Sequence, residues 1–99
     1  MHARVSTYES SDAAGLVEGF KSVTDELEQV DGFSHALFLV DPDTGEAMSI
    51  TVWESQDALE ASVAKAEELR RRGTQPSGST ISSVKHYEVA HTAGARTRA

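Results

Sequence analysis

Residues 32–55, GFSHALFLVDPDTGEAMSITVWES, decide the fold of this chain. Two runs inside this stretch, at 33–40 and 47–53, are rich in apolar, aromatic and β-branched residues. Residues of these types favour packed strands. We therefore predict two strands, joined through the short polar segment between them.

That segment, DPDTGE, has the residues of a tight turn. Pro42 fixes φ at the first corner, and Gly45 supplies a positive φ. The carboxylate of Asp41 can accept hydrogen bonds from the backbone that follows it. We predict a β-hairpin with a four-residue loop, closed by Asp41 opposite Glu46.

This register sorts the hairpin side chains between two faces, because successive strand residues point in opposite directions. One face is uniformly apolar and consists of Leu37, Leu39, Met48, Ile50 and Val52. The other mixes apolar and hydroxyl side chains and consists of Ala36, Phe38, Val40, Ser49, Thr51 and Trp53. We expect the apolar face to pack under helices. The mixed face would then expose a patch of the kind that marks an interface or a pocket.

Before the hairpin, the sequence predicts a strand and a helix. The strand is the alternating segment 3–8. The helix follows N-cap candidates at 10–12. Its single apolar stripe consists of Leu16, Phe20, Val23, Leu27 and Val30. Gly15 and Gly19 are poor helix formers, and we expect them to allow close contact with the sheet.

After the hairpin, the sequence predicts one continuous helix and a last strand at 81–90. Ser55 caps the helix, and Gly73 stops it after the arginine run 70–72. The arginines could form an anion site, although a solvated helix end is the commoner reason for such a run.

The resulting order is that of an α+β, ferredoxin-like βαββαβ sandwich with a four-stranded antiparallel sheet. Helices cover one face of such a sheet. We expect a second copy of the chain to cover the other face, so that the two sheets form a homodimeric α/β barrel. We assign residues 1–90 to a single domain and 91–99 to a flexible C-terminal tail.

Composition limits the partners of this chain. Its net charge is −7, whereas a nucleic-acid-binding surface needs clustered Lys and Arg, so we expect no nucleic-acid partner. Cysteine is absent, which excludes disulfides and thiolate metal sites. No run approaches the roughly 20 apolar residues of a membrane helix, and residues 1–4 lack the apolar core of a signal peptide. We expect a cytoplasmic protein with no membrane partner.

A few short motifs link this pattern to a known family. They are Gly32-Phe33 at the start of the second strand, the hairpin turn, and Trp53-Glu54-Ser55 followed by Asp57 and Leu59. Over residues 3–90 the chain resembles the antibiotic biosynthesis monooxygenase-like domains of the dimeric α/β-barrel superfamily. That family includes cofactor-independent monooxygenases of polyketide-type aromatics and haem-degrading enzymes. The resemblance implies a pocket between the sheet and the helices of each subunit.

The resemblance also implies site residues, which this chain matches only in part. An Asn on the first strand and a Trp on the third are typical, and haem degraders add a His on the second helix. Trp53 matches the Trp, whereas the chain contains no Asn and has Val63 where the haem ligand would stand. We therefore expect no haem and no other cofactor. A polar group that would hold a substrate oxygen or a developing anion is also missing.

The predicted place of Trp53 conflicts with the implied pocket, because the register puts this side chain on the face without helices. Three explanations are open. The register is shifted by one residue, or Trp53 lies at the strand end and reaches both faces, or Trp53 is a structural residue of the core or the dimer. A buried Trp normally packs and satisfies its one N–H, which favours the third.

The candidate ligand-binding residues are aromatic residues and histidines: Trp53, Tyr8, His86, Tyr87 and His35. All of these except His35 could line one aromatic and polar pocket for a small aromatic ligand. A His can act as a base or a metal ligand near neutral pH. No Asp or Glu is spaced beside these histidines, so we predict no metal site, and a surface position is the simpler role. No residue is assigned a catalytic role.

Three functions remain open. The first is a small-molecule-binding dimer, in which catalysis is lost with the missing Asn. The second is a cofactor-independent monooxygenase acting on an aromatic or polyketide-type substrate. The third is a structural or interaction module. An internal cavity lined by converging polar groups would favour the first two, and an interior filled by side chains would favour the third.

Overall fold

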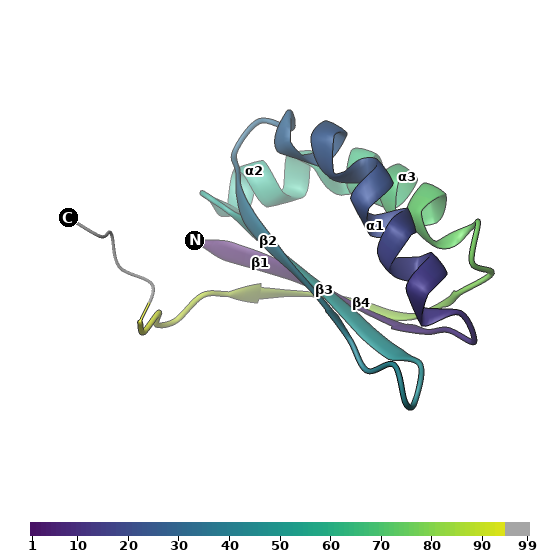
Figure 1. Ribbon diagram of the computed structural model, residues 1–99. Coiled ribbons are helices and arrows are strands. Elements are labelled where there is room, and N and C mark those ends of the chain that lie inside the picture. Colours follow the sequence, from purple (N-terminus) through teal and green to yellow (C-terminus); the bar gives the residue numbers. More distant parts are fainter. Residues whose placement is uncertain (95–99) are drawn as a thin grey trace.

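The computed structural model describes residues 1–94, which form a four-stranded antiparallel sheet covered by helices on one face (Figure 1). The elements are β1 (His2–Glu9), α1 (Ala13–Glu28), β2 (Phe33–Val40), β3 (Glu46–Trp53), α2 (Gln56–Ala61), α3 (Val63–Thr74) and β4 (Thr80–Glu88). The strand order is β2-β3-β1-β4. The predicted α+β ferredoxin-like sandwich is confirmed. Of the predicted tail, residues 91–94 form no helix or strand, and residues 95–99 lie outside the described part.

The hairpin forms with the predicted loop and register. The backbone N–H of Asp41 donates to the carbonyl of Glu46 at 2.8 Å, and Gly45 has a φ of 81°. The Asp41 carboxylate accepts from the backbone N–H of Asp43 at 2.9 Å. Val40 pairs with Ala47, so the hairpin residues share faces as predicted.

The assignment of the two faces, however, was wrong. Trp53 is fully buried with residues of α1, α2 and α3, whereas Leu37 and Leu39 are 54% and 46% exposed. The mixed face therefore lies under the helices, and the uniformly apolar face is the open one. Periodicity identified which residues share a face. It could not show which face is covered, because hydroxyl groups on the covered face find partners inside the protein.

The first helix forms with the predicted buried stripe, but it ends at Glu28, before Val30, and Gly15 lies against the side chain of its cap Asp12. Asp12 caps α1, and its carboxylate accepts from the backbone N–H of Gly15 at 2.9 Å. The buried residues of the stripe are Leu16, Phe20, Val23 and Leu27. Gly19 contacts Gly73 of α3 rather than the sheet. This glycine therefore allows two helices to approach each other closely.

The second helix is divided in two, whereas the sequence predicted one. The capping by Ser55 is confirmed, since its hydroxyl accepts from the backbone N–H of Ala58 at 3.0 Å. The break falls at Ser62, whose buried hydroxyl accepts a hydrogen bond from Arg4 of β1. Gly73 does not stop α3, which continues to Thr74. Of the arginine run, Arg72 is paired with Glu26 and Glu68.

The core joins two groups of side chains under the helices. One surrounds Trp53 and includes Leu27, Leu59 and Leu69. The other contains Tyr8, Leu16, Phe20 and Ala47, and Phe38 packs against both groups. Among residues 1–94, no helix has the length and apolarity needed to cross a membrane.

Candidate functional site

A small cavity of about 40 Å³ lies between the sheet and the helices α1 and α3. Its polar lining comes from Arg4, Ser6, Tyr8, Ser49, Thr51 and Arg70. Apolar side chains of α1, β2 and α3 supply the rest. A few polar groups in an apolar surround are the usual composition of a ligand pocket. The cavity is our candidate site.

Arg4 is the most unusual residue of the lining, because its charged side chain is only 3% exposed. Its Nη2 donates to the carbonyl of Leu59 at 3.0 Å and to Ser62 Oγ at 3.1 Å, and its Nε donates to His86 Nε2 at 3.2 Å. Nη1 is buried and has no partner among the described residues. Burial, reinforced by Arg70, lowers the pKa of Arg4 to about 10, so the guanidinium stays charged at neutral pH.

Tyr8 places a phenol beside the cavity. Its hydroxyl is hydrogen-bonded to Ser49 Oγ at 2.7 Å, and its ring packs on Phe20 at a centroid distance of 5.3 Å. Burial raises the pKa of Tyr8, and the hydroxyls of Ser49 and Ser6 oppose this effect only in part. At neutral pH the phenol therefore keeps its proton and can donate a hydrogen bond.

His86 lies on β4, next to Arg4. Because its Nε2 accepts from the Arg4 guanidinium, the imidazole is neutral in this arrangement, with its proton on Nδ1. Burial lowers the pKa of His86, and the charges of Arg4 and Arg70 lower it further, while Glu60 acts in the opposite sense. His86 thus orients Arg4 rather than providing it with a counter-charge.

Trp53 is packed against neighbouring side chains, and its one polar group is hydrogen-bonded. Its indole N–H donates to Thr51 Oγ1 at 3.0 Å, and its ring meets Phe33 edge-on at 5.5 Å. The guanidinium of Arg4 lies 5.7 Å from the centre of the ring, within the range of a cation–π contact. Trp53 is thus a core residue with a satisfied N–H, which contacts the lining residues Arg4 and Thr51 but does not line the cavity itself.

The five candidate site residues do not line one pocket. Tyr8 lines the cavity, and Trp53 and His86 contact Arg4. Tyr87 and His35 are exposed and alternate with residues of the helix-covered face, so they lie on the open face. Their binding roles stay predictions. Within residues 1–94, no three His, Asp or Glu side chains are grouped as metal ligands.

Sequence reasoning missed Arg4, Ser6, Ser49, Thr51 and Arg70 as cavity residues. The alternation of Arg4, Ser6 and Tyr8 along β1 puts these three on one face, and this was the available signal. The sequence alone gives no sign that Arg4 is buried, because a single charged residue in a strand usually faces solvent. Its burial becomes visible only when β1 is placed between two other strands.

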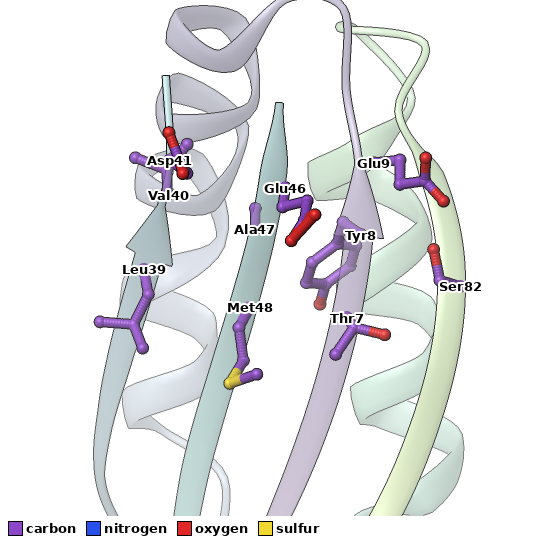
Figure 2. Close-up of a pocket in the computed structure, with 10 residues that line it drawn as sticks. All are labelled: Thr7, Tyr8, Glu9, Leu39, Val40, Asp41, Glu46, Ala47, Met48 and Ser82. Carbon is purple, nitrogen blue, oxygen red and sulfur yellow. The ribbon is translucent and has the colours of Figure 1, made fainter. Parts of the chain in front are cut away.

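A second, larger hollow lies on the opposite side of the sheet. Figure 2 shows this groove, of about 540 Å³, next to the β2–β3 hairpin. Leu39 and Met48 of the open apolar face line it together with Thr7, and Glu9, Asp41 and Glu46 give it an acidic rim. The groove and the cavity lie on opposite sides of the sheet and share only Tyr8 in their linings.

Sequence comparisons give two similar proteins. No family model matches the chain. Two proteins of Mycobacterium tuberculosis, described as uncharacterized (MT2635 and Rv2558), are 37% identical over 70 residues. The match covers 70% of this chain but only 30% of their length.

Solved structures match the whole fold at low identity. SnoaB of Streptomyces nogalater, a cofactor-independent oxygenase, has a TM-score of 0.72 and 16% identity, covering 94% of this chain and 96% of its own. The heme-degrader MhuD of M. tuberculosis has a TM-score of 0.72 and 22% identity, covering 95% and 100%. ActVA-Orf6 of Streptomyces coelicolor, a monooxygenase, has a TM-score of 0.68 and 17% identity, covering 92% and 88%. The chain therefore has the fold of the antibiotic biosynthesis monooxygenase-like domains.

Proposed function

We propose that this chain is a small-molecule-binding protein whose site is the cavity under the helices. The observation that carries the proposal is the lining: buried Arg4 and Tyr8 place polar groups beside the apolar side chains of Phe20, Phe38 and Leu69. Such a lining gives both apolar contact and a means of orienting a ligand.

Proteins of the same fold support ligand binding. MhuD is described with two hemes in its active site, and ActVA-Orf6 in complex with nanaomycin D. This chain has no Asn, and no His between residues 56 and 74, where α2 and α3 lie. An aromatic ligand without a metal is therefore the class we propose, and catalysis is not required of the site.

The cavity must open to take such a ligand. Its volume is about 40 Å³. Pockets for drug-sized ligands have roughly 300 Å³ or more. Arg70 on α3 is only half-buried and lines the cavity, which makes it a lining residue of that helix that is already in part exposed to solvent. We propose that a ligand enters by displacing this part of the lining.

We also propose that the protein acts as a homodimer in the cytoplasm. The open face presents Leu37, Leu39 and Tyr87 with about half of each side chain exposed. Covering this face would contribute about 25 cal/mol per Å² of apolar surface removed from water. A second copy presents an identical apolar face and would also cover the groove beside the hairpin.

Cofactor-independent oxygenation is the alternative function. SnoaB is described as such an oxygenase. In this chain the buried donors Arg4 and Tyr8 could stabilise an anion that develops on a bound substrate. Anthrone tests the idea, because its oxidation to anthraquinone consumes one O2, inserts one oxygen atom and releases the other as water. We expect oxygen uptake to fall in Tyr8→Phe if the alternative holds.

The binding proposal is tested by calorimetric titration with 2-naphthol, which is neutral at pH 7. We expect saturable binding to the wild-type protein. Ala66→Leu adds bulk to the cavity lining and should abolish this binding, whereas Ala64→Leu, on the exposed side of the same helix, should preserve it. Absence of saturable binding both of 2-naphthol and of its carboxylate analogue 2-naphthoate would favour the interaction module. Equal effects of the two variants would place the site elsewhere.

A further inference from the structure

The buried guanidinium of Arg4 has an unused donor. Its Nε and Nη2 are bonded to neutral acceptors, and Nη1 is buried without a partner among the described residues. A buried polar group without a partner is costly, and a buried charge more so, unless something satisfies it. A ligand acceptor at Nη1 would remove that cost.

The positive charge of Arg4 also has no counter-charge in the part of the chain that the structure describes. The ion pairs formed by residues 1–94 involve Lys21, Lys65 and Arg72. The cavity lining contains no Asp or Glu and adds a second guanidinium, that of Arg70. In a chain of net charge −7, this is a local concentration of positive charge around a cavity.

The neutral groups of the lining can also donate. Tyr8 and Ser49 share one hydrogen bond, which leaves one of their two hydroxyl protons available. Thr51 Oγ1 accepts from the Trp53 indole, so its own proton is free to donate. A site with two cations, several hydroxyl donors and no carboxylate is chemically suited to an anion.

We infer that the cavity selects ligands that carry an anionic oxygen, either a carboxylate or a phenolate, and that Arg4 is the counter-ion. The apolar part of the ligand lies against the lining formed by Phe20, Phe38 and Leu69. This inference rests on the proposed function, since it names the ligand class of the same site. It makes Arg4 the residue that determines specificity.

The experiment compares 2-naphthoate with 2-naphthamide, two probes of similar size that differ in charge. Calorimetric titration at pH 7 should show the wild-type protein binding the carboxylate about tenfold or more tightly, since a charge-assisted hydrogen bond is much stronger than a neutral one. Arg4→Met should reduce the preference to less than about threefold. Arg71→Met changes an exposed arginine outside the lining and should keep the wild-type preference.

A second variant covers the case in which Arg4→Met does not fold, because that change removes the Arg4 donor from Ser62 Oγ and one of the donors to the Leu59 carbonyl. Arg70→Met removes a cavity cation and keeps every hydrogen bond of Arg4. It should lower the preference by a smaller factor than Arg4→Met. Circular dichroism identifies which variants are folded.

The outcomes separate this inference from the proposed function. Equal affinity for the two probes would overturn the anion inference and leave small-molecule binding intact. A preference that survives in folded Arg4→Met, or is unchanged in Arg70→Met when Arg4→Met is unfolded, would also overturn it. No binding of either probe overturns the inference as well, and the 2-naphthol titration then decides whether the proposed function fails with it.

Discussion

Gly19 of α1 packs so closely on the backbone of Gly73 in α3 that a Cβ atom on Gly19 would overlap the Gly73 carbonyl oxygen. The two helices therefore meet backbone to backbone at this point. We expect Gly19→Ala to lower the free energy of unfolding by about 2 kcal/mol, because the helices must separate to make room for the methyl group. Urea denaturation followed by circular dichroism measures this change.

Gly73→Ala is the matched control. A Cβ atom on Gly73 would lie 3.3 Å from the Gly19 carbonyl oxygen, which a small adjustment relieves. The better helix propensity of Ala, about 1 kcal/mol, offsets that adjustment, so we expect little net change. Equal losses in the two variants would show that Gly19 has no special role at the crossing.

The hydrogen bond from the Trp53 indole to Thr51 supports a second prediction. Thr51→Val should lower the free energy of unfolding by about 1–3 kcal/mol, because it leaves a buried N–H unpaired. In a Trp53→Phe background the same substitution should cost much less, since no N–H remains to be satisfied. Chemical denaturation of the four proteins gives the coupling. Identical costs in both backgrounds would mean that the bond contributes nothing.

The lowered pKa of His86 predicts a pH dependence of stability. Between the folded-state pKa and the ordinary value of about 6.5, the unfolded chain binds more protons at this residue than the folded chain. The contribution of His86 is therefore complete above pH 6.5 and is lost as the pH falls through the folded-state pKa. Melting temperatures between pH 5 and pH 8 should decline on the acid side of this range.

His86→Gln tests the assignment, because the Gln amide oxygen can still accept from Arg4 but does not titrate. We expect the decline on the acid side to become shallower in this variant, with little change at pH 8. A profile parallel to that of the wild-type protein would assign the decline to other groups.

The architecture could be predicted from local signals. Pro42 and Gly45 specify the turn through their own backbone preferences, and the turn specifies the register of both strands. Which face of the sheet packs under the helices could not be predicted, because it depends on hydrogen-bond partners that are distant in sequence. Ser49 is tolerable under the helices only because the Tyr8 hydroxyl, 41 residues away, bonds it. The hydroxyl side chains of the mixed hairpin face were taken as a sign that this face is exposed. In the structure, Ser49 and Thr51 of that face line the cavity.

The break between α2 and α3 has a similar origin. Residues 56–74 contain no Pro, the residue that would indicate a break in a helix. The interruption coincides with Ser62, which accepts from Arg4 on the first strand, 58 residues away. Arg4 itself was missed because a single charged residue in a strand is most often at the surface. Long-range polar pairs thus account for the parts of the site that the sequence did not show.

Leu37 of the edge strand β2 is paired with Ile50 of β3 on the open face, and Leu37 is 54% exposed. If a second copy covers this face, Leu37→Glu places a carboxylate in an apolar interface, where it lacks a partner. We expect the wild-type protein to be a dimer by analytical ultracentrifugation at micromolar concentration and Leu37→Glu to be a monomer. Ala64→Glu, on the exposed side of α3, should remain a dimer. A monomeric wild-type protein, or a Leu37→Glu variant that still pairs, would contradict the dimer.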